Sequence, residues 1–324
     1  MYYRKLGKTG LNASVIGFGC NQIGSGKTGY KDFARAKEAL FLALDKGINY
    51  FDTADVYGER LSEEWLGRIL GSERAKVIIS TKAGLTGDGG RNGHPDHLRN
   101  SLENSLKKLK TDYVDMFYLH RPDPKIPLAE SIGGINNLIR EGKARFGGVS
   151  QLSLEELRTV KNDTAVSCVQ YCLNFFDFQT TYSIRSETSA MHYGFSTFSP
   201  LASGWILKTK YTALAKSKFP FFQPGYYRPE FPAYKLVIQL AQEHQIGIHQ
   251  LAIHWVLNHQ EVHSVICGTS SCDQLQENIK ALDLSVTSDL IEKINDIVQK
   301  YTVEGHKMRK IVWGIGTKMK KVLH

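Results

Sequence analysis

The segments Val77-Ile-Ile-Ser-Thr-Lys82 and Val114-Asp-Met-Phe-Tyr-Leu-His120 decide the fold, because each is a short apolar run of the kind that forms a buried strand. The chain between them carries leucines at helical spacing, all on one face: Leu98, Leu102, Leu106 and Leu109. A strand, a helix and a second strand in this order predict a β/α unit with parallel strands.

The same alternation extends along the whole chain. Eight runs are expected as strands: Val15–Phe18, Asn49–Asp52, Val77–Lys82, Val114–His120, Ala144–Val149, Val166–Gln170, Gly194–Phe198 and Ser264–Cys267. Helical patterns fall between nearly all of them, and the composition does not change along the chain. We therefore expect a (β/α)8 TIM barrel as one domain over residues 1–324. An open doubly wound sheet would alternate in the same way, but its polar groups would cluster after the first one or two strands.

An N-terminal β-hairpin and two long loops complete the expected organisation. Tyr2–Leu6 and Ala13–Phe18, separated by Gly7–Gly10, predict a hairpin that leads into the first barrel strand. Residues 84–95 and 200–232 form long loops, and loops of that length in a compact domain are usually functional.

The composition is ordinary for a soluble globular protein. Of 324 residues, 42% are hydrophobic and 23% are charged. The chain has no apolar run of about 18 residues, and its N-terminus lacks the apolar core of a signal peptide, so no membrane partner is expected. Five cysteines, an odd number without a tight framework, favour reduced thiols and a cytoplasmic location.

The formal net charge of +9 is diffuse and is densest in a basic C-terminal tail, residues 305–324. Such a tail could contact nucleic acid or an anionic surface, or it could be a solvated end that keeps the protein soluble. Since no stretch interleaves aromatic and basic residues, no nucleic-acid partner is expected.

Two glycine-rich segments resemble nucleotide-binding motifs but fail on spacing. Gly24–Thr28 is similar to the end of a P-loop, but Asn21 stands where that motif needs a glycine. Gly17-Phe-Gly19 follows a strand, but the third glycine of the dinucleotide fingerprint would fall on Gln22. Both motifs are therefore rejected.

One pair of histidines and one pair of cysteines were also considered as metal sites and rejected. In His259-Gln-Glu-Val-His263 the glutamate is one place late for a zinc-protease motif. Cys168 and Cys172 fit a strand face better than a zinc site. No metal is predicted.

Four polar side chains are predicted to meet at one end of the barrel. Asp52, Lys82 and His120 end three consecutive strands, and Tyr57 follows Asp52 by five residues. Singly, such an aspartate could be a cap and such a histidine a core residue. Together they lie at the C-terminal ends of strands, the face on which barrels carry their active sites. An acid, a phenol, a cation and a second donor at one mouth suit proton transfer to a carbonyl oxygen.

Between Gly7 and about Leu284 the chain resembles the aldo-keto reductases. The resemblance rests on these motifs: Leu6-Gly-Lys-Thr-Gly-Leu11, Phe51-Asp-Thr-Ala-Asp-Val-Tyr-Gly58, Ser80-Thr-Lys82, Asp115-Met-Phe-Tyr-Leu-His120, Gly142-Lys-Ala-Arg-Phe-Gly-Gly-Val-Ser150, Ser199-Pro-Leu201, Val265–Ser271 and Gln274–Asn278. It implies NAD(P)H-dependent reduction of an aldehyde or ketone to an alcohol. It also implies a catalytic tetrad of Asp52, Tyr57, Lys82 and His120.

Each member of that tetrad has an expected role. Tyr57 is the proton donor, and the Lys82 ammonium is expected to lower the phenol pKa from its ordinary value of about 10. Asp52 holds Lys82 in place and keeps it charged. His120 hydrogen-bonds the carbonyl oxygen and orients the substrate.

The resemblance also implies a cofactor site. Ser150 and Gln170 would hold the carboxamide, and Phe198 would stack on the nicotinamide ring. The pyrophosphate would be held by Ser199, Leu201, Ser203 and Gly204. The ribose-phosphate end would be held by Gly268, Thr269, Ser270 and Gln274, and the adenine by Glu277 and Asn278. Many members carry Lys and Arg where this chain has Gly268 and Gln274, and Gln151 stands where Asn is usual. NADP(H) is favoured over NAD(H), because hydroxyls and amides at a helix N-terminus suit a phosphate.

The substrate and the physiological role are less defined. Arg121 follows His120 where many relatives carry Trp, and a guanidinium at the rim suggests a polar or anionic substrate such as a sugar derivative. Pairing of Arg121 with Asp123 at a loop bend is an equal alternative. A cofactor-binding sensor subunit with slow turnover is the alternative to a metabolic enzyme.

Overall fold

The computed structural model describes residues 1–26, 29–175, 178–207 and 232–300. The basic tail at 305–324, most of the predicted long loop over 200–232, and residues 27–28 of the rejected P-loop segment lie outside the described residues.

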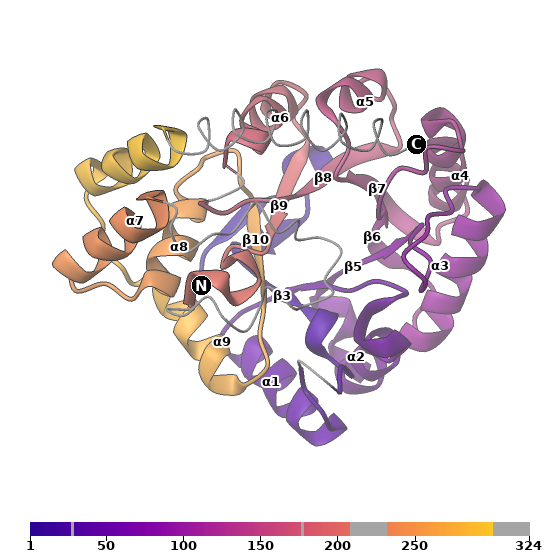
Figure 1. Cartoon of the computed structure of the whole chain (residues 1–324). Helices are drawn as coiled ribbons and strands as arrows, with labels where there is room; N and C mark the ends of the chain where they lie inside the picture. The colour runs from indigo at the N-terminus through magenta and orange to yellow at the C-terminus, as the bar shows by residue number, and fades with distance from the viewer. Residues whose placement is uncertain (27–28, 176–177, 208–231, 301–324) are drawn as a thin grey trace, which may run out of the picture.

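Eight parallel strands close into a barrel in the order β10-β3-β4-β5-β6-β7-β8-β9, with helices around it (Figure 1). The strands are β3 (Ile16–Gly19), β4 (Tyr50–Asp52), β5 (Ile78–Ala83), β6 (Val114–Leu119), β7 (Ala144–Ser150), β8 (Val166–Cys172), β9 (Gly194–Phe198) and β10 (Ser264–Gly268). The predicted (β/α)8 barrel is confirmed, and each strand agrees with its expected range to within two residues at either end.

Helices form the outer ring around the strands. They are α1 (Phe33–Asp45), α2 (Ser62–Leu70), α3 (Pro95–Leu109), α4 (Leu128–Arg140), α5 (Leu154–Thr159), α6 (Phe178–Ala190), α7 (Pro232–Glu243), α8 (Ile248–Leu257) and α9 (Cys272–Ile279), and residues 288–300 are also helical. On α3 the buried apolar residues are the four leucines that the spacing predicted: Leu98, Leu102, Leu106 and Leu109.

The N-terminal hairpin pairs β1 (Tyr3–Lys5) with β2 (Asn12–Ser14) in antiparallel register. The prediction treated Ala13–Phe18 as one strand, whereas the structure divides it at Val15. The Val15 amide donates to the Tyr2 carbonyl in the hairpin (3.0 Å), and its carbonyl accepts from Val265 of the barrel (2.8 Å). The chain therefore changes sheets at this residue.

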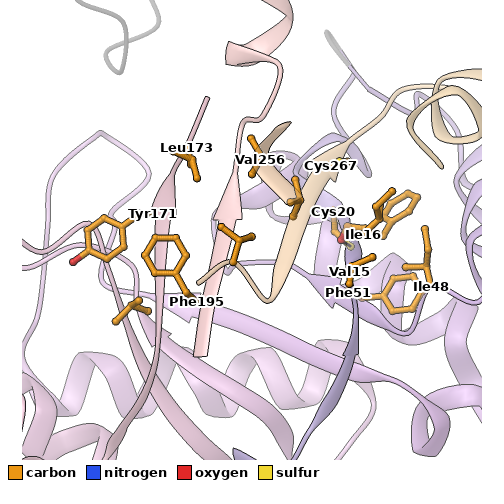
Figure 2. Close-up of a cluster of buried hydrophobic side chains, with 14 of the residues drawn as sticks. Val15, Ile16, Cys20, Ile48, Phe51, Tyr171, Leu173, Phe195, Val256 and Cys267 are labelled. Carbon is orange, nitrogen blue, oxygen red and sulfur yellow. Dashed lines mark hydrogen bonds between the residues drawn. The ribbon is translucent and has the colours of Figure 1, made fainter. Parts of the chain in front are cut away.

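Side chains alternate between two layers along each strand. Figure 2 shows part of the outer layer, where Phe51, Phe195 and Val256 pack between strands and helices. On β5, Ile79 and Ala83 join this outer layer, whereas Ile78 joins the cluster inside the barrel. Lys82 has the same parity as Ile78, so its side chain ends an inward-facing row.

Candidate active site

Asp52 and Lys82 form a buried ion pair at the C-terminal ends of β4 and β5. Lys82 Nζ lies 2.6 Å from Asp52 Oδ2 and donates to the Thr53 carbonyl oxygen at 2.9 Å. The two residues are 3% and 0% exposed respectively. Burial of a charge is tolerated only where the charge is paired and hydrogen-bonded, and Lys82 satisfies both conditions.

Tyr57 reaches this pair from the loop after β4. Its hydroxyl oxygen lies 3.5 Å from Lys82 Nζ, which is 4.9 Å from the centre of the phenol ring. The next residue, Gly58, has a φ of 56°, and a Cβ there would lie 1.7 Å from the Ile23 carbonyl oxygen. Only glycine allows this close backbone contact, which fixes the loop directly beside Tyr57.

His120 completes the set from the residue after β6. Its ring centre lies 5.6 Å from that of Tyr57, and the two planes meet at 78°. The imidazole Nδ1 is buried and has no hydrogen-bond partner among the described residues. The structure thus brings together the four side chains that the sequence analysis selected.

Burial and neighbouring charges together set the protonation of Lys82 and His120. Burial lowers the pKa of Lys82, but the Asp52 charge outweighs it with help from Tyr57, so the pKa is raised overall. Burial, and then the positive charges of Lys82 and Arg121, hold the pKa of His120 well below its ordinary value. At neutral pH the site therefore combines an ammonium with a neutral imidazole.

The expected direction of the Tyr57 pKa was wrong. Burial raises the pKa of the phenol above its ordinary value, and the Lys82 ammonium only opposes that rise. The physical reason is that the sequence analysis counted the nearby cation and left out the desolvation of a phenolate in a closed site. Tyr57 consequently rests as a protonated phenol.

Two further side chains hold Asp52, and neither was predicted from the sequence to contact it. Ser80 donates to Asp52 Oδ1 at 2.6 Å, and the Gln170 amide donates to the same oxygen at 2.9 Å. Ser80 precedes Lys82 by two residues on one strand, so the period of two was a usable signal. Gln170 was selected only for cofactor binding, and the structure also brings it into contact with Asp52.

The residues proposed to hold the carboxamide and the nicotinamide ring come from the next strands around the barrel. Ser150 and Gln170 pair in register across β7 and β8, and both are 2% exposed. Phe198 ends β9 and is only partly buried. These residues continue the inner row that begins at Asp52 and Lys82, so the candidate cofactor site borders the tetrad.

The proposed pyrophosphate loop follows β9. Ser199 has a φ of 54°, and its carbonyl oxygen accepts from the buried Asn174 amide at 3.1 Å. Leu201 and Gly204 are partly buried, and Ser203 lies in the 3-10 helix Ala202–Leu207. The Asn174 contact fixes the backbone at the start of this loop.

The ribose-phosphate end contains hydroxyl groups that already have partners. Thr269 shares a hydrogen bond with the Tyr30 hydroxyl (2.9 Å), and the Ser270 hydroxyl donates to Gln274 Oε1 (3.1 Å). Ser271 caps α9 by accepting from the Gln274 amide at 3.2 Å. Gly268 is exposed at the end of β10. A phosphate there would compete with these internal contacts.

The proposed adenine pair lies further along α9. Asn278 is 3% exposed. Glu277 accepts from Lys280 at 2.5 Å and from the Gln250 amide at 3.0 Å. The pair therefore combines a buried amide with a carboxylate that neighbouring residues hold in place.

Arg121 lies one residue beyond His120 and is partly buried. Burial lowers the pKa of its guanidinium, as does the positive charge of Arg91. The carboxylate of Asp123, the alternative partner considered for Arg121, accepts from the backbone amides of Gly93 (3.2 Å) and Lys125 (2.9 Å).

A closed (β/α)8 barrel with Asp, Tyr, Lys and His side chains at its mouth is the arrangement expected of an aldo-keto reductase. Comparison with known proteins leads to the same family. The family model described as "Aldo/keto reductase family" matches residues 15–299, so the chain belongs to the aldo/keto reductase family, whose members are NAD(P)-dependent oxidoreductases.

Individual relatives carry two kinds of name. The chain is 30% identical to "Probable aldo-keto reductase 1" of Glycine max, over 93% of this chain and 90% of that protein. It is 32% identical to "Probable voltage-gated potassium channel subunit beta" of Oryza sativa subsp. japonica, over 92% of this chain and 97% of that one.

Solved structures show the same similarity. Aldo-keto reductase AKR11C1 from Bacillus halodurans, in its holo form, superposes with a TM-score of 0.77 at 25% identity, covering 92% of this chain and 96% of that chain. Glycerol dehydrogenase AKR11B4 from Gluconobacter oxydans gives 0.77 at 26% identity, covering 90% and 93%. Over the part of the chain that the structure describes, none of the helices has the length and apolar character needed to cross a membrane.

Proposed function

We propose that this protein reduces an aldehyde or ketone to an alcohol with NAD(P)H, and that Tyr57 donates the proton. The observation that carries the proposal is the position of Lys82 Nζ, which is 2.6 Å from the Asp52 carboxylate and 3.5 Å from the Tyr57 hydroxyl. An ammonium held by an acid beside a phenol is suited to proton transfer, because it stabilises the negative charge left on the phenol oxygen.

The protonation states favour the reductive direction. Tyr57 rests protonated because burial raises its pKa, so it has a proton to give. His120 rests neutral and can donate one N–H to the substrate oxygen without adding a second charge. As the phenol loses its proton, the neighbouring Lys82 ammonium stabilises the phenolate that forms on Tyr57. Asp52 keeps Lys82 charged throughout.

The side chains at the C-terminal ends of β7 to β10, and in the segments that follow β9 and β10, suit a nicotinamide cofactor. When bound, the cofactor supplies the hydride. Ser150 and Gln170 would hold its carboxamide, and the partly exposed Phe198 ring offers a face for stacking. Ser199, Leu201, Ser203 and Gly204 would hold the pyrophosphate. Gly268, Thr269, Ser270, Gln274, Glu277 and Asn278 would hold the adenosine end.

We propose NADP(H) ahead of NAD(H), but with a small margin. The start of α9 offers backbone amides to a phosphate, which favours NADP. The exposed Gly268 supplies no charge, and the Thr269, Ser270 and Ser271 hydroxyls have internal partners. We assign Arg121 to the substrate, which makes a polar carbonyl compound the expected class.

A sensor subunit is the second candidate. It is favoured by the rice relative, which is named a probable potassium channel β subunit and is 32% identical to this chain. A sensor and an enzyme differ in rate, since a sensor binds cofactor tightly and turns it over very slowly.

The test is a steady-state assay of NADPH and NADH oxidation against a panel of aldehydes and ketones. Typical enzymes turn over at about 1–10³ per second, and a rate in that range with any carbonyl compound supports the reductase. Tight cofactor binding with turnover slower than about once per minute across the panel would favour the sensor and reject the reductase.

A further inference from the structure

The Gln170 side chain joins the candidate cofactor site to the buried ion pair. Its amide nitrogen donates to Asp52 Oδ1 at 2.9 Å, and the same oxygen accepts from the Ser80 hydroxyl at 2.6 Å. The other carboxylate oxygen, Oδ2, lies 2.6 Å from Lys82 Nζ. Asp52 therefore accepts hydrogen bonds from two side chains of β5 and from one side chain of β8.

The charge on Asp52 determines which end of the Gln170 amide faces it. An ionised carboxylate is only an acceptor, so its partner must be the amide nitrogen and not the amide oxygen. The reversed amide would place two oxygens in contact without a proton between them. Asp52 and Gln170 are only 3% and 2% exposed, and an acceptor left without a donor is costly at such a buried position.

The oxygen of the same amide is left for a ligand. The Gln170 backbone is held on both sides, since β8 pairs with β7 at Ser150 and with β9 at Ser196. Within the described structure, Gln170 Oε1 accepts no hydrogen bond, and it is not one of the fully enclosed polar atoms that lack a partner. With its backbone fixed and its nitrogen committed to Asp52, Gln170 presents an acceptor.

We infer that Asp52 fixes the polarity of the cofactor site through Gln170, so that the site selects a cofactor whose nicotinamide substituent donates an N–H. This inference rests on the cofactor part of the proposed function, in which Gln170 contacts the carboxamide. A carboxamide carries both an NH2 group and a carbonyl oxygen, and a freely turning glutamine would accept it either way round. The Asp52 charge removes that choice. Asp52 is in this respect a positioning residue, because it acts on the cofactor through another side chain.

The probe is a cofactor in which a methyl group replaces the amide NH2. The 3-acetylpyridine analogues of NADP⁺ and NAD⁺ keep the carbonyl oxygen but have no N–H to donate. Calorimetric titration gives the dissociation constant of the analogue and that of the natural cofactor, using whichever of NADP⁺ and NAD⁺ binds wild type more tightly. The quotient of the two constants is the discrimination ratio. In wild type it should be at least roughly three- to tenfold in favour of the natural cofactor, the usual effect of one hydrogen bond.

Asp52→Asn should lower the discrimination ratio by roughly three- to tenfold. Because Lys82 Nζ needs an acceptor, the asparagine turns its carbonyl oxygen to Lys82 and its NH2 group to Gln170. The Gln170 amide must then turn its nitrogen to the cofactor, which suits the acetyl carbonyl. Gln170→Met should lower the ratio to the same extent, and the double variant should lower it no further. A wild-type ratio in Asp52→Asn, or additive effects in the double variant, would overturn the inference.

Two further variants are matched controls. Ser80→Ala removes a hydrogen bond to the same Asp52 oxygen but leaves the charge, so its discrimination ratio should equal that of wild type. Gln239→Met removes another amide that donates to a carboxylate, that of Glu243 at 2.7 Å on the exposed face of α7, and should also match wild type. If Ser80→Ala lowers the ratio as much as Asp52→Asn does, the charge of Asp52 is not what orients the amide, and the inference is overturned.

These binding measurements are independent of turnover. Ratios that change as expected, in a protein that reduces no carbonyl compound, would support the polarity of the site and reject the reductase. Unchanged ratios in an active reductase would do the reverse, and a wild type that binds neither NADP⁺ nor NAD⁺ would reject both. Asp52→Ala replaces Asp52→Asn if the latter does not fold, and its ratio should also fall, because nothing then fixes the Gln170 amide.

Discussion

Lys82 is the residue on which the other charges of the site depend. Its ammonium pairs with Asp52, bonds the Thr53 carbonyl and lies beside Tyr57. Its strand position was visible in the sequence, since Lys82 ends an apolar run. The dominance of burial over the Lys82 charge at Tyr57 could not be predicted, because desolvation depends on how closely the finished barrel surrounds the phenol.

We predict that Lys82→Met both inactivates and destabilises the protein. The methionine leaves the Asp52 carboxylate buried without its cation, and breaking a buried pair in this way costs about 3–5 kcal/mol. Asp52→Asn should be destabilising for the converse reason and should retain more activity, since Lys82 stays in place. Urea unfolding and pH-rate profiles of both variants check this.

The double variant Asp52→Asn/Lys82→Met provides the control for the stability part. Because it removes both charges, it should be more stable than the sum of the two single effects predicts. Additive losses, or pH-rate profiles identical to wild type in both single variants, would contradict the proposed coupling.

At the scale of elements, two acids that each have a buried carboxylate oxygen, Asp55 and Glu63, lie beside the strand that carries Lys82. The Asp55 amide donates to the Lys82 carbonyl at 3.2 Å, and Thr81 donates to Glu63 of α2 at 2.6 Å. Within the described structure, Asp55 Oδ1 and Glu63 Oε2 are buried and have no hydrogen-bond partner. Burial, followed by the Glu63 charge, raises the pKa of Asp55 to about 7. The arrangement of Asp55 and Glu63 could not be predicted from the sequence, since their contacts join different elements.

This pair predicts a loss of stability as the pH rises. The Asp55 carboxyl titrates near 4 in the unfolded chain and near 7 in the folded one, so the folded state binds more protons between these values. Stability should therefore fall through this window and stay low above it. Asp55→Asn cannot ionise, so relative to wild type it should gain about 1–3 kcal/mol between pH 5 and pH 8. Denaturant unfolding at both pH values measures the difference, with exposed Asp45→Asn as control. An equal Asp55→Asn effect at both pH values would contradict the prediction.

The start of α9 sets the expected choice of cofactor. Since Gly268 and Gln274 carry no charge, NADP should bind only about tenfold more tightly than NAD, or roughly 1.4 kcal/mol. Gln274→Arg should increase this preference, because it adds a cation and releases the Ser270 amide and hydroxyl that now bond the Gln274 side chain. Fluorescence titration of both reduced cofactors against wild type and the variant checks this. If wild type binds one of the two cofactors a thousandfold more tightly than the other, another residue must recognise the 2′ position of the ribose.

At the scale of the whole molecule, the barrel was predictable because it repeats one local pattern eight times. The C-terminal ends of the expected strands then placed Asp52 and Lys82 at one mouth from the sequence pattern, whereas Ser150, Gln170 and Phe198 were selected from the family resemblance. The Gln170–Asp52 bond could not be predicted, because it joins residues 118 positions apart and exists only once the barrel has closed. The change of sheets at Val15 was not predicted, because the barrel partner of its carbonyl oxygen, Val265, is distant in sequence.

The most direct test of the central claim is the turnover of Tyr57→Phe. This substitution removes one hydroxyl and leaves the ring that packs beside His120, so fold and cofactor affinity should be kept. Removing a positioned general acid should lower kcat by about 10²–10⁴-fold, whereas the exposed Tyr2→Phe should match wild type. A folded Tyr57→Phe protein that binds NADPH normally and reduces carbonyl substrates at the wild-type rate would contradict the assignment of Tyr57 as the proton donor.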